Sequence, residues 1–77
     1  MIDKRQHKRN LRELRHSTVE QLHRLRHESG LSLEEVSQST NMPMPLLKDM
    51  ETGGVKDIVT LSLLAGYYGK KVKVVFY

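Results

Sequence analysis

Six cationic side chains near the start of the chain are the residues best suited to an anionic partner. These cations are Lys4, Arg5, Lys8, Arg9, Arg12 and Arg15. The only acid among residues 4–16 is Glu13, so this segment has a net charge of +5. Clusters of this kind commonly contact phosphates, and as often form a solvated helix face. Residues 1–16 are therefore predicted to be a basic extension or helix that either binds a polyanion or remains in solvent.

Three histidines are the next candidates for chemistry. On one continuous helix His16, His23 and His27 would share a face, and His23 with His27 has the i,i+4 spacing of a metal pair. No acid completes a ligand set there, and the cationic surroundings oppose a metal ion. The sequence also has no Ser–His–Asp order, phosphate-binding loop or paired carboxylates in an apolar setting. We therefore expect no metal, no cofactor and no catalysis.

Length and composition indicate one small domain. The chain has 77 residues, a net charge of +4 and no cysteine, which excludes disulfides and thiolate metal sites. No apolar run approaches the length of a membrane span, and Met1-Ile2-Asp3 does not open a secretory signal. We expect a cytoplasmic protein that does not contact a membrane.

The centre of the chain predicts two short helices joined by a tight turn. Ser32 followed by Glu35 is a capping-box start, and residues 41–43 (Asn-Met-Pro) break that first helix. A second helix is predicted from Pro45 to Thr52, because a residue that precedes proline is pushed away from helical angles. It stops at Gly53.

Helices are also predicted on both sides of this pair. Ser17 and Glu20 form another capping box, which predicts a helix that starts at Ser17 and ends at Gly30. A single long helix through Ser17 is the alternative, because its apolar stripe continues upstream. Asp57 is expected to cap a last helix that ends at Gly69. Residues 17–69 would thus form the helical domain.

Residues 70–77 read as a β-strand by their β-branched and aromatic content. Everything upstream is helical, so this strand has no partner within the chain. Pairing with the same strand of a second chain would satisfy its backbone, which predicts a homodimer; a frayed tail is the alternative. The predicted dimer interface consists of Val72, Val74, Val75 and Phe76.

Residues 22–69 resemble the phage-repressor (Cro/repressor-like, XRE-type) helix-turn-helix domain, except that the loop after Gly53 is about one residue short. The matching residues are Leu25-Arg26, Gly30-Leu31-Ser32, Glu35-Val36, Met42, Leu47, Met50-Glu51, Gly53, Leu61, Leu64-Ala65 and Tyr68-Gly69. The final strand is similar to that of HipB-like antitoxins, whose strands pair between subunits. The resemblance implies a mostly α, lambda-repressor-like bundle of four to five helices plus one C-terminal β-strand that pairs across a dimer.

The resemblance also implies roles for individual residues. Arg26 and Glu51 match a structural salt bridge of the family. The positions that read bases in the major groove, and those that contact phosphates, correspond to Met44, Pro45, Lys48, Asp49, Thr52 and Lys56. Lys4, Arg5, Lys8 and Arg9 could add phosphate contacts as an arm.

Several of these positions depart from the family pattern. Leu33 replaces a frequent glutamine, Met44 and Pro45 have no side-chain hydrogen-bond donor, and Asp49 repels phosphate while it could accept a bond from cytosine. Only Lys48 is a conventional groove residue. The sequence still favours a sequence-specific transcriptional regulator, a repressor or antitoxin-like protein that binds double-stranded DNA as a homodimer and, in an antitoxin role, a toxin. The alternative is a protein-interaction module that keeps the fold without base readout.

Overall fold

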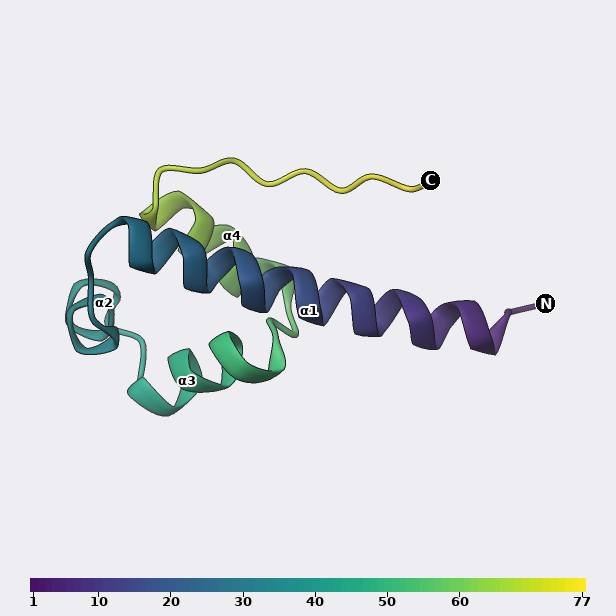
Figure 1. The fold of residues 1–77 in the computed structure, drawn as a ribbon, viewed down its shortest axis with the longest axis horizontal. Coiled ribbons are helices and arrows are strands. Elements are labelled where there is room, and N and C mark those ends of the chain that lie inside the picture. Colours follow the sequence, from purple (N-terminus) through teal and green to yellow (C-terminus); the bar gives the residue numbers. More distant parts are fainter.

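The computed structural model describes residues 1–77 and contains four helices and no strand. These are α1 (Lys4–Glu28), α2 (Leu33–Thr40), α3 (Met44–Gly53) and α4 (Ile58–Tyr67). The long α1 runs through the molecule, with α3 on one side and α4 on the other, and its N-terminal half projects beyond both (Figure 1). No helix combines the length and apolar content needed to cross a membrane.

Helix α1 is continuous, so the predicted new start at Ser17 is wrong and the single-helix alternative is correct. The helix begins where Asp3 accepts hydrogen bonds from the amides of Arg5 and Gln6, at 3.0 and 3.1 Å. Its 25 residues include no glycine or proline, and they span about 37 Å at the usual rise per residue. Ser17 caps nothing because mid-helix amides already bond to carbonyl oxygens one turn earlier; its hydroxyl accepts from Gln21 at 2.7 Å.

The core is small and lies beside the C-terminal half of α1. All four helices contribute to it, with five side chains that are nearly inaccessible to solvent: Leu22, Val36, Leu47, Met50 and Leu64. By contrast, every residue from 1 to 16 is exposed. The N-terminal half of α1 therefore extends from the folded body as a solvated helix.

The turn between α2 and α3 is built from local hydrogen bonds. The predicted capping box is present: the amide of Glu35 donates to Ser32 Oγ at 3.1 Å, and the amide of Ser32 donates to Glu35 Oε1 at 3.3 Å. Asn41 ends α2 with a left-handed φ of 63°. Helix α3 then starts at Met44, one residue earlier than predicted. Pro45 is tolerated at the second position because the first amides of a helix have no intrahelical partner.

The predicted C-terminal strand is not formed in the single chain. The amide of Lys70 donates to Ala65 at 2.8 Å, but no backbone hydrogen bond involves residues 71–77. This segment runs back beside the body as an extended chain (Figure 1). A strand requires a neighbouring strand, and no other extended segment of this chain lies beside it.

Candidate nucleic-acid interface

Helix α3 has one buried face and one solvent face. Leu47 and Met50 anchor its inner side in the core. The outer side presents the predicted groove-reading positions: Pro45, Lys48, Asp49 and Thr52 are exposed, and Met44 is half-buried. Proline, lysine, aspartate and threonine thus project from one side of a short helix.

The hydrogen-bonding capacity of this outer face is modest. Lys48 is its only cation and is followed by the anion Asp49. The Thr52 hydroxyl donates to the carbonyl oxygen of Lys48 at 2.8 Å, so its proton is engaged within the helix while its oxygen can still accept. Pro45 offers neither a side-chain donor nor an amide. Direct base contacts would therefore come mainly from Lys48, with apolar contacts from Met44 and Pro45.

An ion pair attaches α3 to α1. Arg26 Nε donates to Glu51 Oε1 at 3.0 Å and to Oε2 at 2.8 Å, and both side chains are largely shielded from solvent. Arg26 also donates through Nη1 to the carbonyl oxygen of Leu31 at 3.0 Å. The hydrogen bond with Glu51 raises the pKa of Arg26 above its ordinary value. The pair that the resemblance implied therefore holds together α1, α3 and the turn before α2.

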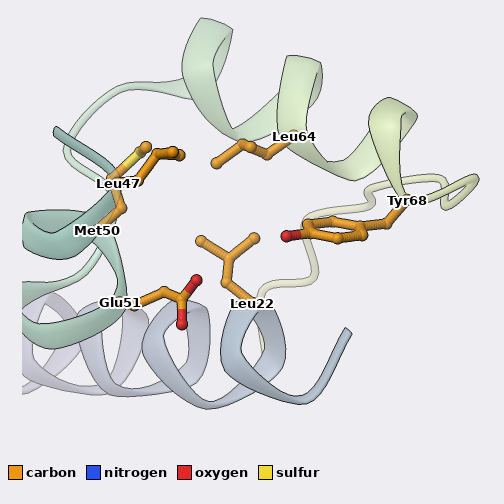
Figure 2. A pocket seen from close by; sticks show the side chains of 6 residues that line it. All are labelled: Leu22, Leu47, Met50, Glu51, Leu64 and Tyr68. Carbon is orange, nitrogen blue, oxygen red and sulfur yellow. The ribbon is translucent and has the colours of Figure 1, made fainter. Parts of the chain in front are cut away.

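Helices α1, α3 and α4 meet behind this ion pair around a cavity of about 10 Å³, roughly the size of one water molecule (Figure 2). Leu22, Leu47, Leu64, Glu51 and Tyr68 are among its lining residues. Burial raises the pKa of Tyr68, and the nearby carboxylate of Glu51 acts in the same direction. This cavity is part of the packed scaffold that holds α3 in place.

The loop after α3 crosses α1 at close range. Gly54 adopts a left-handed φ of 91°, and a Cβ atom built there would lie 2.8 Å from Arg15 Cα. One residue later, the amide of Val55 donates to the Thr18 hydroxyl at 3.1 Å. The sequence interpretation missed Thr18, because a mid-helix threonine carries no local signal of a contact with a distant loop. Lys56 follows in this loop and is exposed.

Most of the basic residues in the N-terminal half of α1 lie on the side of this helix that faces α3, whereas Arg24 lines the groove on the side of α4. Lys8, Arg15 and Leu22 are separated by seven residues each, so they share one face of a straight helix. Leu22 lies in the core, and Arg15 contacts the loop that follows α3. Lys4 and Arg12 lie within about one turn of Lys8 on this face, Arg5 borders it, and Arg9 lies roughly a quarter turn away. The exposed outer side of α3 and the cations in the N-terminal half of α1 are thus on the same side of the molecule.

The histidines have protein partners. His23 Nδ1 lies 3.3 Å from Glu51 Oε1, its ring stacks on His27 at 5.4 Å, and His16 Nε2 lies 3.1 Å from Glu20. No three acids, histidines or cysteines are grouped so that they could hold a metal ion. The residues of the predicted dimer interface lie in the C-terminal segment and are all exposed, Val72 least.

Comparisons with known proteins identify the domain. No curated protein and no solved structure matches the chain significantly. A family model described as a helix-turn-helix domain matches residues 21–70, well over half of the 77 residues. The match extends from the C-terminal part of α1 to just beyond the end of α4. Domains of this kind are typically non-catalytic, and they suggest a DNA partner. The chain therefore belongs to the helix-turn-helix domain family.

Proposed function

We propose that this protein is a sequence-specific transcriptional regulator of the phage-repressor type that binds double-stranded DNA as a homodimer. The observation that carries the proposal is the position of the basic face of α1 on the same side as α3. A duplex that receives α3 in its major groove would meet the projecting cations along its backbone. We further propose that it acts in the cytoplasm as a repressor or an antitoxin. In the antitoxin role its protein partner would be a toxin.

The two parts of the interface would divide the work of recognition. Phosphate contacts supply much of the affinity without reading sequence, and this role falls to Lys4, Lys8 and their cationic neighbours on α1, together with Lys56. Base readout falls to Lys48, whose ammonium group can reach guanine acceptors, with thymine methyl contacts from Met44 and Pro45. Affinity would therefore depend mostly on α1, and sequence preference mostly on α3.

Titration of the purified protein against random duplex DNA at two salt concentrations tests the proposal. Four phosphate contacts would weaken binding about a hundredfold between about 50 and about 200 mM salt. Absence of binding even at the lower concentration would refute DNA binding. Selection from a random duplex library then determines whether one sequence is preferred.

Paired charge removals locate the phosphate contacts. Replacement of Lys4 and Lys8 by Gln should lower the salt slope of binding by about two, because two cations leave the proposed interface. The matched control replaces Lys70 and Lys71 by Gln, which removes the same charge outside that face. Equal effects from both pairs would mean that net charge alone governs binding.

The role of Lys48 is tested by its replacement with Ala. Base preference should relax by about 1–3 kcal/mol at one position of the selected site, while the salt slope changes by no more than about one. An equal loss of affinity for all DNA sequences would mean that Lys48 contacts a phosphate instead of a base.

Dimerisation through the C-terminal segment is a separate part of the proposal. Residues 71–77 have no backbone hydrogen bonds of their own and carry Val72, Val74, Val75 and Phe76 in solvent. Pairing with the same segment of a second chain would satisfy that backbone and bury these side chains. Proline at Val74 removes an amide from the paired strand and should give monomers in sedimentation velocity. An unchanged sedimentation coefficient would refute strand pairing.

A protein-interaction module is the second candidate, and one observation favours it. Leu46 is 41% exposed on α3 and stands next to Pro45, so part of the outer face is apolar where base readers are usually polar. A protein partner would bury this apolar surface. The salt titration separates the two candidates, because a module without a DNA function would not bind random duplex.

A further inference from the structure

The outer face of α4 is uncharged, mostly apolar and unpartnered, with Ser62 as its exposed polar residue. Ile58 is 80% exposed, Val59 67% and Leu63 60%, although all three belong to a regular helix. The ten residues of α4 include no charged side chain. Only the opposite side of the helix is packed, with Leu64 and Ala65 buried.

A helix without charged residues, and with apolar side chains on its outer as well as its inner side, is normally covered on both sides. A surface helix of a protein that works as a monomer would carry charged residues outward, as the outer side of α1 does. Here the exposed apolar side chains are neighbours: Ile58 and Val59 are consecutive, and Val59 and Leu63 are four residues apart, one turn along the helix. Contiguous exposed apolar surface of this kind marks an interaction site.

This face continues into the apolar surface beneath the C-terminal segment. Ile58, Leu61 and Ala65 follow one another at three- and four-residue spacing, so they form one stripe along α4. Leu61 and Ala65 also line a groove of about 510 Å³ between α1, α4 and residues 70–75. The outer face of α4 and the proposed dimerisation segment are therefore parts of one surface.

We propose that this face of α4 packs against the same face of a second copy of the chain, with the two helices antiparallel across a two-fold axis near Ser62 and Leu63. The proposal rests on the homodimer proposed above and adds a helix-to-helix contact to it. A two-fold interface uses the same patch on both chains, so the patch must be complementary to itself.

The distribution of side-chain volume along α4 favours the antiparallel arrangement. The N-terminal end of the face is bulky, with Ile58 and Val59, whereas its C-terminal end has Gly66. A Cβ atom added at Gly66 would meet no atom within 4 Å, so the space over this residue, here called the Gly66 notch, is open in the monomer and carries no side chain. In an antiparallel pair centred near Ser62 and Leu63, Val59 would lie against the partner's Gly66. In a parallel pair the bulky Ile58 and Val59 of one chain would meet the same residues of the other, and the space over Gly66 in both chains would stay empty.

The charges at the ends of the helix favour the same arrangement. Asp57 caps the N-terminus of α4, where its carboxylate accepts hydrogen bonds from the amide and hydroxyl of Thr60 at 2.7 and 2.9 Å. Lys70 lies just beyond the C-terminus and is exposed. Antiparallel packing brings opposite charges together at both ends and opposes the two helix dipoles. No charge needs to be desolvated between these ends.

Two leucine variants test the contact. Leu63→Glu places a charge at the centre of the proposed interface and should raise the dimer dissociation constant at least about tenfold in sedimentation equilibrium. The matched control is Leu46→Glu, which makes the same change at an exposed leucine of α3. This control should leave the dimer unchanged. Equal dimerisation of both variants and the wild type overturns the proposal.

A glycine variant separates an effect on the interface from an effect on the fold. Gly66→Leu adds a good helix former in open space, so the thermal midpoint of the monomer should not fall. The same side chain fills the notch that would receive the partner's Val59, so the dissociation constant should again rise at least about tenfold. A dimer that is as tight as the wild type contradicts the antiparallel contact.

A single cysteine provides a positive test. The chain has no cysteine, so Ser62→Cys introduces a unique thiol near the proposed axis, where two Cα atoms would lie within disulfide range. Mild oxidation should give a covalent dimer, whereas Gln38→Cys on the exposed side of α2 should not. If dimers form only through residues 72–76, Val74→Pro should abolish them and Ser62→Cys should fail to cross-link. That combination of results overturns the α4 contact but leaves the strand-paired dimer in place. A wild-type chain that is monomeric throughout overturns both dimer proposals, and DNA binding is then judged by the salt titration alone.

Discussion

The ion pair between Arg26 and Glu51 allows a quantitative test of how α3 is held. The side chains are only 16% and 12% exposed; the arginine shares its Nε hydrogen between the two carboxylate oxygens of Glu51 and donates from Nη1 to Leu31. Removal of one partner of a buried pair costs about 3–5 kcal/mol, whereas exposed pairs contribute about 0–1 kcal/mol. For this mostly shielded pair we expect a loss of about 2–3 kcal/mol from either Arg26→Met or Glu51→Leu.

The physical reason is that each single variant leaves a shielded charge without its counter-ion. The double variant removes both charges, so its free energy of unfolding should fall by no more than that of either single variant. The coupling energy between the two side chains would then be about 2 kcal/mol. A chain of this length is expected to have a free energy of unfolding of about 4–12 kcal/mol, so each single loss is a large fraction of the total.

Urea denaturation followed by far-UV circular dichroism measures these differences. With a slope of about 1 kcal/mol per M for so small a protein, a single variant should shift the midpoint by about 2 M. His23→Ala is the control, since this side chain is 57% exposed and should contribute less than about 1 kcal/mol. Two results would refute the reasoning: single variants whose free energy of unfolding lies within about 0.5 kcal/mol of the wild type, or a double variant whose loss equals the sum of the two single losses.

Three further variants test the scaffold by urea denaturation. Leu47→Ala should lose about 2–5 kcal/mol because it opens a cavity in a core with few other side chains, and a smaller loss would mean that the core collapses around it. Gly54→Ala should lose about 1–3 kcal/mol because its Cβ would press on the backbone of Arg15, whereas Gly53→Ala, in open space, should be neutral or stabilising. Hydrogen bonds from the first turn of α4 lower the pKa of Asp57, so its contribution is present above the unfolded-state pKa and is lost as the pH falls through the folded-state pKa. Asp57→Ala should therefore flatten the decline in stability on acidification, and an unchanged pH profile would contradict this assignment.

The features that sequence predicted well are local ones. The Ser32–Glu35 box, the cap at Asp57 and the break at Asn41 each depend on hydrogen bonds or backbone angles within four residues. Local signals also misled at two places. Ser17 has the pattern of a cap but lies in mid-helix, and α3 includes Met44 despite the proline that follows.

The candidate site was predictable in part. The resemblance indicated which residues of α3 face outward, because helical spacing determines which positions share a side once Leu47 and Met50 are in the core. The contact of Thr18 with Val55 was not predictable, since the two residues are 37 positions apart in the sequence and neither has a distinctive pattern. The exposure of Ile58 and Leu63 was equally hidden, because apolar spacing around all of α4 does not identify its buried side.

The sequence by itself determined the helix-turn-helix family, the caps and the charge of the first sixteen residues, because composition and short-range hydrogen bonding are written in neighbouring residues. Only the tertiary structure decided that α1 is one continuous helix, and therefore that most cations of its N-terminal half lie on the side of α3. It also decided that α4 keeps an apolar face in solvent and that residues 71–77 have no strand partner within the chain. These outcomes depend on which surfaces meet, and contacts between distant segments are determined by packing of the whole chain.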